Sequence, residues 1–472
     1  MNSHPFVSEE ELARQRTFIQ RVRDLKERPR TFHIVTLGCQ MNQRDSETIA
    51  GMLVQMGLCP QAVREKADLI LYNTCCVREN AENRALGNVV WLKELKKERP
   101  GLMICVGGCM AQEEGMAERM KAQYPFIDLI LGTHNMHKLP EYLFSALKTR
   151  RPVVEIERSD GVIVEGLPER RSSAFSAFVN VMYGCDNFCS YCIVPYVRGR
   201  ERSRDPQDVL EECDRLVQSG VREITLLGQN VNSYRGGGGA FADLLYRIDR
   251  LGVERIRFMT SHPKDLSDEL IAAYGEIKHL MPNLHLPVQA GNDEILRAMN
   301  RRYTRQRYLE LVENVRAVKP DIGLSTDIIV GFPGETDAQF EDTMALVERV
   351  RFDSAFTFIY SRRAGTKAAQ MADDTPASVK TERIERLIAL QQEISREILT
   401  AQIGRVEEVL VESVSARNAQ DVGGKTPRGH MVNFPGNADL IGRLVKVKIT
   451  SAGRNTLRGQ RYMEEERYGC RV

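Results

Sequence analysis

The chain has 472 residues, and a typical domain size of about 150 residues favours about three domains over one. Its 42% hydrophobic and 28% charged residues exclude a disordered chain, a collagen-like chain and a small disulfide scaffold. The 66 Lys and Arg nearly balance the 64 Asp and Glu, so the net charge of +2 indicates no basic footprint over the whole protein, only room for a local one. The 11 cysteines are odd in number and scattered, which favours metal ligation or thiol chemistry over a disulfide framework.

The N-terminal sequence carries no export signal. Residues 1–16 lack an apolar signal-peptide core, and no run in the chain approaches 18 consecutive apolar residues. These patterns predict a cytoplasmic protein without a membrane partner. We expect residues 1–30 to be an N-terminal extension with a surface helix. Its apolar positions on one helical face are Leu12, Phe18, Ile19, Val22 and Leu25.

Residues 31–148 are predicted to form an α/β domain with a parallel sheet, because short apolar runs alternate with helical stretches. The expected strands are 32–37, 69–72, 102–106 and 129–131, and the expected helices are 45–57, 79–98 and 112–122. The first three strands lead directly into Cys39, Cys75 and Cys109. The carboxyl ends of parallel strands meet at one sheet edge, where ligands bind, so these three thiolates can come together.

Residues 148–172 are charged and are predicted to be a linker, and residues 171–401 are predicted to form a partial (βα)6 barrel. Six strand-like runs alternate with helices, which is too few for the eight units of a TIM barrel. The strands are 175–182, 223–227, 255–259, 284–288, 323–330 and 354–360, and the helices are 206–219, 240–250, 266–274, 304–318, 336–349 and 378–400. In such barrels the chemistry gathers at the carboxyl ends of the strands.

Residues 402–467 are predicted to form a small all-β barrel, with strands at 406–414, 430–434 and 444–450 separated by Gly, Asn and Pro turns. Residues 402–472 contain 12 Lys and Arg against 8 Asp and Glu, a net of +4, which leaves −2 for the rest of the chain. A small basic barrel suggests a nucleic-acid module, with a solubilising cap as the alternative. The candidates for phosphate contacts are Arg443, Lys446, Lys448, Arg454 and Arg458.

Cys185, Cys189 and Cys192 form a C-x3-C-x2-C motif directly after the first barrel strand. Zinc usually takes four protein ligands as two close pairs, and no fourth cysteine is near. A ferredoxin run has two-residue gaps and a cysteine–proline end, and this motif has neither. Three thiolates on a 4Fe–4S cluster leave one iron open for a substrate or cofactor. A zinc site or a chance cluster is the alternative.

This motif, with Tyr191 before its last cysteine, resembles that of the radical S-adenosylmethionine (SAM) superfamily, whose partial barrel agrees with the six βα units. The surrounding segments resemble the methylthiotransferases, in particular the MiaB type, which modifies isopentenyl-adenosine in tRNA. The final barrel resembles the TRAM RNA-binding domain. The matching segments, within about residues 31–467, are 36–42, 73–79, 107–109, 191–199, 227–232, 285–289, 327–336 and 432–436.

The resemblance implies two 4Fe–4S clusters and two SAM molecules per turnover. One cluster, on Cys185, Cys189 and Cys192, would bind the SAM that yields a 5′-deoxyadenosyl radical. An auxiliary cluster, on Cys39, Cys75 and Cys109, would be tied to sulfur delivery. The radical would abstract hydrogen from C2 of N6-isopentenyladenosine beside the tRNA anticodon, and sulfur insertion and methylation by the second SAM would follow. A C2–H bond is neither acidic nor readily displaced, so a radical cofactor suits it.

The resemblance also implies partners and contact residues. The partners are a tRNA carrying N6-isopentenyladenosine and an electron donor such as flavodoxin or ferredoxin, and we expect a monomer. The candidates for SAM contacts are Tyr191, Gly228, Gln229, Asn230, Gln289 and Asp327, with packing or structural hydrogen bonds as their alternative roles. Arg363 matches a family arginine, with a surface role as the alternative, and Ala364 departs from a proline common there. Cys76 could compete with Cys75, which occupies the Asn-Thr-Cys position.

Two other functions remain open at this stage. One is a sister enzyme that applies the same chemistry to threonylcarbamoyl-adenosine in tRNA or to an aspartate of a ribosomal protein. The other is an iron–sulfur RNA-binding protein without catalysis, against which the intact three-cysteine motif and the six βα units argue. The sulfur could come from the auxiliary cluster itself or from a sulfide attached to it.

Overall fold

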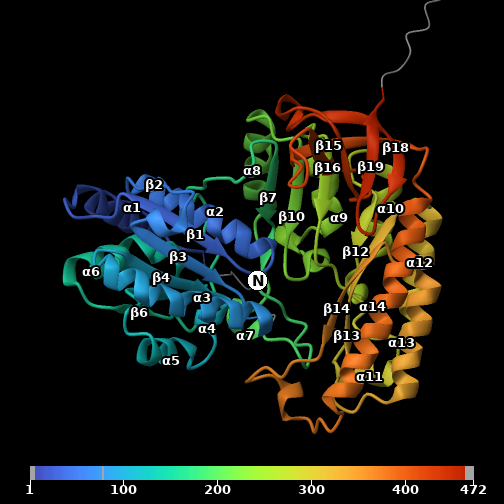
Figure 1. The fold of residues 1–472 in the computed structure, drawn as a ribbon, viewed down its shortest axis with the longest axis horizontal. Coiled ribbons are helices and arrows are strands. Elements are labelled where there is room, and N and C mark those ends of the chain that lie inside the picture. Colours follow the sequence, from blue (N-terminus) through green and yellow to red (C-terminus); the bar gives the residue numbers. More distant parts are fainter. Residues whose placement is uncertain (1–5, 77–78, 463–472) are drawn as a thin grey trace, which may run out of the picture.

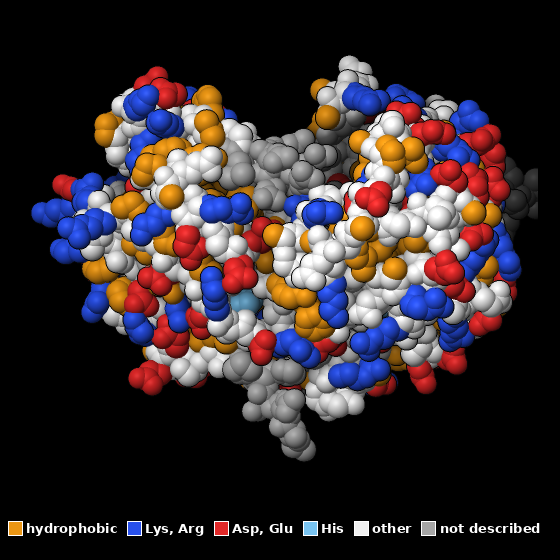
Figure 2. All heavy atoms as spheres, turned by 90° about the horizontal axis from the view of Figure 1, so that it is seen from below, with side chains coloured by type: hydrophobic (Ala, Val, Ile, Leu, Met, Phe, Trp, Pro, Cys, Tyr) orange, Lys and Arg blue, Asp and Glu red, His pale blue; other side chains and the backbone are white. Residues whose placement is uncertain are grey.

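The computed structural model describes residues 6–76 and 79–462, and it confirms the α/β fold class with three structured parts (Figure 1). The N-terminal sheet lies beside the central barrel, and the small C-terminal β-barrel packs on the far part of the central one. On the face shown in Figure 2, basic and acidic side chains are interspersed, in line with the nearly balanced charge. Among the described helices, none is both long and apolar enough to cross a membrane.

The N-terminal sheet has six parallel strands in the order β2-β1-β3-β4-β5-β6. The four predicted strands are present as β1 (Thr31–Thr36), β3 (Leu69–Thr74), β4 (Met103–Gly108) and β5 (Leu129–Leu131). Two short edge strands were not predicted, β2 (Cys59–Pro60) and β6 (Val153–Glu155). Strand β6 lies within the segment expected to be a linker, and its few apolar residues are too short a run to stand out in the sequence.

Helices cover both faces of this sheet, because successive strand residues point to opposite sides. Leu69 and Leu71 pack with one hydrophobic cluster, whereas Ile70 and Tyr72 pack with the other. The helices are α1 (Glu9–Asp24), α2 (Gln40–Gln55), α3 (Glu79–Glu98), α4 (Cys109–Gln112), α5 (Met116–Gln123) and α6 (Leu139–Thr149). The predicted helix 112–122 is divided between α4 and α5, and α5 begins after Gly115, whose φ is 72°.

Helix α1 is the predicted helix of the N-terminal extension. Ser8 caps it by accepting a hydrogen bond from the amide of Glu11 at 3.2 Å. The helix packs on α6, where the Phe18 and Phe144 ring centroids are 5.7 Å apart.

The central barrel has the six predicted parallel strands. They are β7 (Ser176–Asn180), β10 (Glu223–Leu227), β11 (Arg255–Phe258), β12 (Asn283–His285), β13 (Gly323–Val330) and β14 (Ser354–Ile359). They form two three-stranded sheets joined by backbone hydrogen bonds from Ile256 to His279 (2.7 Å) and from Met281 to Ile256 (2.9 Å). The six expected helices are α8 (Pro206–Gln218), α9 (Phe241–Asp249), α10 (Asp268–Glu276), α12 (Arg305–Val318), α13 (Asp337–Val350) and α14 (Ala377–Thr400).

Three small elements of this region were not predicted. Helix α7 (Val194–Arg198) follows the cysteine motif, α11 (Asp293–Ala298) precedes α12, and β8 (Met182–Tyr183) pairs with β9 (Arg202–Ser203). The β8–β9 pair holds the segment with Cys185, Cys189 and Cys192 as one loop.

The C-terminal strands close into a five-stranded barrel in the order β15-β16-β17-β19-β18. The three predicted strands are β15 (Val406–Val414), β17 (Met431–Pro435) and β18 (Leu444–Ala452). Strands β16 (Asp421–Lys425) and β19 (Leu457–Arg461) were missed because each carries a single large apolar residue. Two glycines in β16, Gly423 and Gly424, pack closely against neighbouring strands, so β16 depends on small residues rather than on an apolar run.

Two buried arginines of β11 fasten the C-terminal barrel to the central one. Arg255 donates to the carbonyl oxygens of Lys425 (2.9 Å) and Glu408 (2.6 Å). Arg257 donates to those of Thr426 and Pro427, both at 2.9 Å, and to the carboxylate of Glu223 at 2.8 Å. A carbonyl accepts best from a donor held in place, so these forks fix the barrel's orientation.

The variant Arg257→Ala is expected to destabilise the protein by about 3 kcal/mol, because it leaves the buried Glu223 carboxylate without its closest cation. Urea unfolding measures this loss. Arg222→Ala is the control, since Arg222 and Glu254 form a partly exposed pair, and it should change stability by less than about 0.5 kcal/mol. Equal losses in both variants would contradict the role given to Arg257.

Candidate active site

The C-x3-C-x2-C segment folds into a compact loop at the end of the first barrel strand. The Cys185 amide donates to the Gly199 carbonyl at 3.2 Å, and the Cys192 amide donates to that of Cys189 at 2.9 Å. Gly184 has a φ of 69° and packs on the backbone of Gly199 and Arg200, where no side chain fits. Cys185 and Cys189 are buried and Cys192 is partly exposed.

The donor chemistry of this loop fits a cluster. Burial raises the pKa of Cys185 to about 12, and burial followed by the neighbouring Cys189 and Cys185 raises that of Cys192. Thiols packed this closely need a positive partner to become thiolates, and iron supplies one. Within the described ranges no three His, Cys, Asp or Glu side chains surround a single-ion position. A cluster does not require such a position, because each of its cysteines binds a different iron.

Arg301 is a buried residue of this site that sequence reasoning missed. Its Nη1 lies 3.4 Å from Cys189 Sγ, and its Nη2 donates to the Pro287 carbonyl at 2.9 Å. Its Nε donates to the Tyr303 hydroxyl at 3.0 Å. Arg301 follows a short helix without any periodic or motif signal, so only the fold reveals its proximity to Cys189.

The expected SAM-contact residues occupy the carboxyl ends of the barrel strands. Gln289 and Asp327 lie side by side, with the Gln289 amide donating to the Asp327 carbonyl at 2.9 Å, and Gln289 has a φ of 70°. A strained backbone at such a rim is typical of a functional position. Tyr191 is half-buried and packs against the barrel core. The structure thus brings Gln289 and Asp327 together and keeps Tyr191 next to its cysteine.

Gly228, Gln229 and Asn230 follow β10 at the same rim. The side chain of Asn230 donates to Asp265 at 2.7 Å, while its Oδ1 is buried and has no hydrogen-bond partner among the described residues. Gln229 reaches the other domain, with Nε2 2.6 Å from Met41 Sδ. The buried oxygen of Asn230 is an acceptor that fits a bound amino group.

Arg363, the family arginine of the sequence comparison, is 9% exposed in the structure. It is therefore not the surface arginine considered as the alternative.

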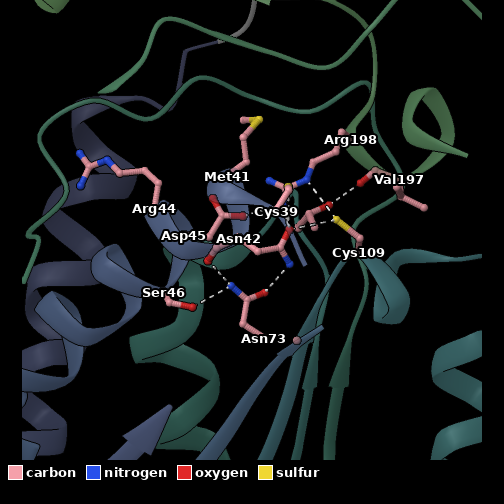
Figure 3. Close-up of polar contacts among 12 residues, drawn as sticks. Cys39, Met41, Asn42, Arg44, Asp45, Ser46, Asn73, Cys109, Val197 and Arg198 are labelled. Carbon is pink, nitrogen blue, oxygen red and sulfur yellow. Dashed lines mark hydrogen bonds and ion pairs between the residues drawn. The ribbon is translucent and has the colours of Figure 1, made fainter. Parts of the chain in front are cut away.

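Cys39, Cys75 and Cys109 follow β1, β3 and β4, as the strand-end argument predicted. The hub of this edge is Asn42 on α2 (Figure 3). Its Oδ1 lies 3.5 Å from Cys39 Sγ and 4.0 Å from Cys109 Sγ. Its Nδ2 donates to the Thr74 carbonyl, next to Cys75, at 2.8 Å. One amide side chain therefore connects all three cysteine loops.

Cys75 and Cys76 face different surroundings. Gly38 packs directly against Cys75, since a Cβ on Gly38 would lie 3.0 Å from Cys75 Sγ. Cys76 instead lies in the hydrophobic cluster with Cys109 and is hydrogen-bonded to it, which raises the pKa of Cys76 and lowers that of Cys109. Cys75 is thus on the Cys39 side of the edge, whereas Cys76 is in the core.

Arg198 joins the two cysteine sites, and sequence reasoning gave it no role. It is the last residue of α7 and is 6% exposed. Its Nε donates to Cys109 Sγ at 3.1 Å, and its Nη2 lies 3.1 Å from Asn42 Oδ1 and 2.7 Å from Asp45 Oδ2 (Figure 3). The motif Tyr196-Val197-Arg198 was visible in the sequence, but its partners lie about 90 and 155 residues away.

A polar cavity of about 490 Å³ lies behind this joint, between α2, β8 and α8. Four arginines line it, Arg44, Arg198, Arg202 and Arg204, and none of the six cluster cysteines does. Its arginines are engaged with carboxylates or carbonyls, so its charge is largely satisfied within the protein.

Comparison with known proteins places three family models on the chain. The Radical SAM superfamily matches residues 179–347, the Uncharacterized protein family UPF0004 matches residues 31–132, and the TRAM domain matches residues 400–461.

Several curated proteins are similar over nearly their whole length. The tRNA-2-methylthio-N(6)-dimethylallyladenosine synthase of Thermoanaerobacter sp. (strain X514) is 50% identical over 465 residues, covering 98% of this chain and 99% of its own. The protein of that name from Acetivibrio thermocellus is 49% identical, covering 96% and 97%. The one from Clostridium botulinum (strain Loch Maree / Type A3) is 50% identical, covering 91% and 96%.

Solved structures with similar folds are more distant in sequence. The radical S-adenosylmethionine methyltransferase TsrM from Kitasatospora setae, with cobalamin and a [4Fe-4S] cluster bound, has a TM-score of 0.51 at 15% identity, covering 72% of this chain and 77% of its own. The same enzyme with tryptophan and a SAM analogue has a TM-score of 0.50 at 14% identity, covering 70% and 72%. These two likenesses support the fold alone.

The position of Gly38 generates a prediction about the two adjacent cysteines. Cys75→Ala is expected to remove iron from the N-terminal site, whereas Cys76→Ala should retain it and cost only the packing of one small side chain. Iron analysis of reconstituted protein, in a background without Cys185, Cys189 and Cys192, measures both. Loss of iron in Cys76→Ala with retention in Cys75→Ala would reverse the assignment.

Proposed function

The chain belongs to the tRNA-2-methylthio-N(6)-dimethylallyladenosine synthase family, and from that premise we propose how its residues divide the work. It is a radical SAM transferase that converts N6-isopentenyladenosine in tRNA to its 2-methylthio derivative. The observation that carries this function is the similarity of about half of all positions over 98% of the chain, cysteine motifs included.

We assign residues 31–148 to an N-terminal methylthiotransferase domain, 171–401 to the radical SAM domain and 402–467 to a TRAM domain. Cys185, Cys189 and Cys192 would hold a 4Fe–4S cluster, and Tyr191, Gly228, Gln229, Asn230, Gln289 and Asp327 would contact SAM. When bound, the reduced cluster and SAM supply a 5′-deoxyadenosyl radical, which takes hydrogen from C2 of the adenosine. Arg301 would hold Cys189 in place through its 3.4 Å contact.

A second 4Fe–4S cluster would sit on Cys39, Cys75 and Cys109 and serve sulfur delivery, with a second SAM giving the methyl group. The support is geometric: three strand ends of one sheet bring these cysteines to one edge, and Asn42 ties their loops. Gln229 of the barrel rim touches Met41 beside this edge, so the two sites share an interface.

The TRAM barrel would hold the tRNA backbone through its basic side chains. Arg443, Lys446, Lys448, Arg454 and Arg458 are all exposed. Lys446 and Lys448 lie on the outer face of β18, where they alternate with the buried Val447 and Ile449. Arg458 also pairs with Asp421 at 3.1 Å. We further propose a cytoplasmic monomer that receives electrons from a flavodoxin or ferredoxin.

The alternatives are less well supported. The curated relatives described above carry the isopentenyl-adenosine name, which favours that substrate over threonylcarbamoyl-adenosine or a ribosomal aspartate. The complete three-cysteine motif within a full set of six βα units argues against a protein without catalysis.

Variants of the two cysteine sets should separate the two halves of the reaction. Any of Cys185→Ala, Cys189→Ala or Cys192→Ala is expected to abolish reductive SAM cleavage, because the cluster loses a ligand. Cys39→Ala should retain cleavage but lose methylthiolation. Chromatography of 5′-deoxyadenosine and mass spectrometry of tRNA nucleosides measure the two outputs. The exposed Cys59, changed to Ala, is the control and should retain both. Methylthiolation by the Cys39 variant would refute the two-cluster assignment.

Lys448→Ala is expected to weaken tRNA binding equally for all tRNA sequences and to reduce the slope of log K against log salt by about one. The reason is the loss of one phosphate contact. Binding isotherms at several salt concentrations measure the slope. Lys425→Ala serves as the control, since Lys425 is paired with Glu412 at 2.9 Å and should leave the slope nearly unchanged. An unchanged slope for Lys448→Ala would exclude this face from tRNA binding.

A further inference from the structure

Arg198 lies between the two cysteine sites in both sequence and space. It follows Cys192 by six residues, and its guanidinium enters the N-terminal domain. Ile193 and Val197, on the segment between them, pack into the hydrophobic cluster that contains Cys109 and Met110. Thr133 also donates its hydroxyl to the Val197 carbonyl at 2.5 Å. The segment is therefore built into the N-terminal domain although it begins at the other cysteine motif.

The contacts of Arg198 are directed at the cysteine edge. Nε donates to Cys109 Sγ at 3.1 Å, and Nη2 lies within 3.1 Å of both Asn42 Oδ1 and Asp45 Oδ2. Through Asn42 the same guanidinium supports the loops of Cys39 and Cys75. Figure 3 shows Arg198 pointing to this group, whereas Arg44 on the same helix as Asn42 points away from it.

The charge of Arg198 cannot be removed by titration, because a guanidinium stays protonated in proteins. It is buried, and Asp45 is the carboxylate that it pairs with. Net charge and hydrogen bonds to the sulfurs are two of the factors that set the reduction potential of an iron–sulfur cluster. Reduction adds one negative charge, so a fixed cation next to a ligand sulfur stabilises the reduced form.

We propose that Arg198 is a positioning residue that raises the reduction potential of the cluster on Cys39, Cys75 and Cys109. This inference rests on the proposed second cluster. It makes the N-terminal site electrically incomplete without the radical SAM segment. A change in the loop that ends at Cys192 would then alter the neighbouring cluster's readiness to accept an electron.

The experiment uses the full chain with Cys185, Cys189 and Cys192 changed to Ala, so that only the N-terminal cluster can form. Dithionite delivers one electron to the cluster during a potentiometric titration, which electron paramagnetic resonance follows, and no bond is broken. Arg198→Gln is expected to reduce the equilibrium constant for reduction at least tenfold, which corresponds to a potential lower by about 59 mV. Arg198→Lys, which keeps the charge, should lie close to the parent.

Arg44→Gln is the matched control. Arg44 is also a largely buried arginine with two carboxylate partners, Glu169 and Glu212, but it does not touch a cysteine. It should cost stability and leave the potential unchanged. A merely structural role for Arg198 would give Arg44→Gln and Arg198→Gln the same potential, and that result would overturn the proposal.

Iron content distinguishes the remaining outcomes. If the parent with three alanines binds no iron, the two-cluster assignment fails, and the proposal fails with it. If iron loads in the parent but in neither Arg198 variant, Arg198 is needed for folding of the site and the inference is wrong. If Arg198→Lys loads and Arg198→Gln does not, the positive charge itself is what the site requires, which supports it.

Discussion

The arrangement of this protein depends on one buried ion pair, that between Arg198 and Asp45. A guanidinium out of water must keep its partners, because breaking a buried pair leaves an uncompensated charge at a cost of about 3–5 kcal/mol. Arg198 comes from the segment after the C-x3-C-x2-C motif, and Asp45 and Asn42 come from the first helix after β1. The carboxyl ends of two separate parallel sheets therefore face each other at a fixed distance. Both cysteine sets lie at that junction, so the same pair orders both.

A wider network repeats this device. Arg44 of α2 pairs with Glu212 of α8 at 2.9 Å, and Arg204 pairs with Glu212 and Glu165 at 2.7 and 2.6 Å. At the opposite end, Arg255 and Arg257 hold the C-terminal barrel. Buried ion pairs are weak evidence for net stability, because desolvation offsets their attraction. Their bidentate geometry is specific, however, so their value here is in fixing how three domains are oriented.

The parts of the fold that were predictable are those whose signal is local. The buried strands β1, β3 and β4 are continuous apolar runs, and each leads into a cysteine, so both the sheet and its functional edge could be read from the residues alone. Strand β16 could not, because two glycines that pack against neighbouring strands leave no apolar pattern. Arg198, Asn42 and Arg301 could not either. A polar residue's role depends on partners far away in the chain, and neither periodicity nor spacing carries that information.

The positions of the two ends of the barrel bear on how an RNA substrate would be held. Arg255 and Arg257 belong to β11, whose first residue is Arg255, and Asp353, which precedes β14, accepts hydrogen bonds from Arg428 at 2.7 Å. The C-terminal barrel is thus fixed at the amino ends of the strands. Gln289, Asp327 and the cysteine motif lie toward the carboxyl ends. On the proposed function, the TRAM barrel would contact the RNA backbone away from the reacting base. Phosphate contacts carry no sequence information, so the choice of adenosine has to be made at the rim beside the cysteines.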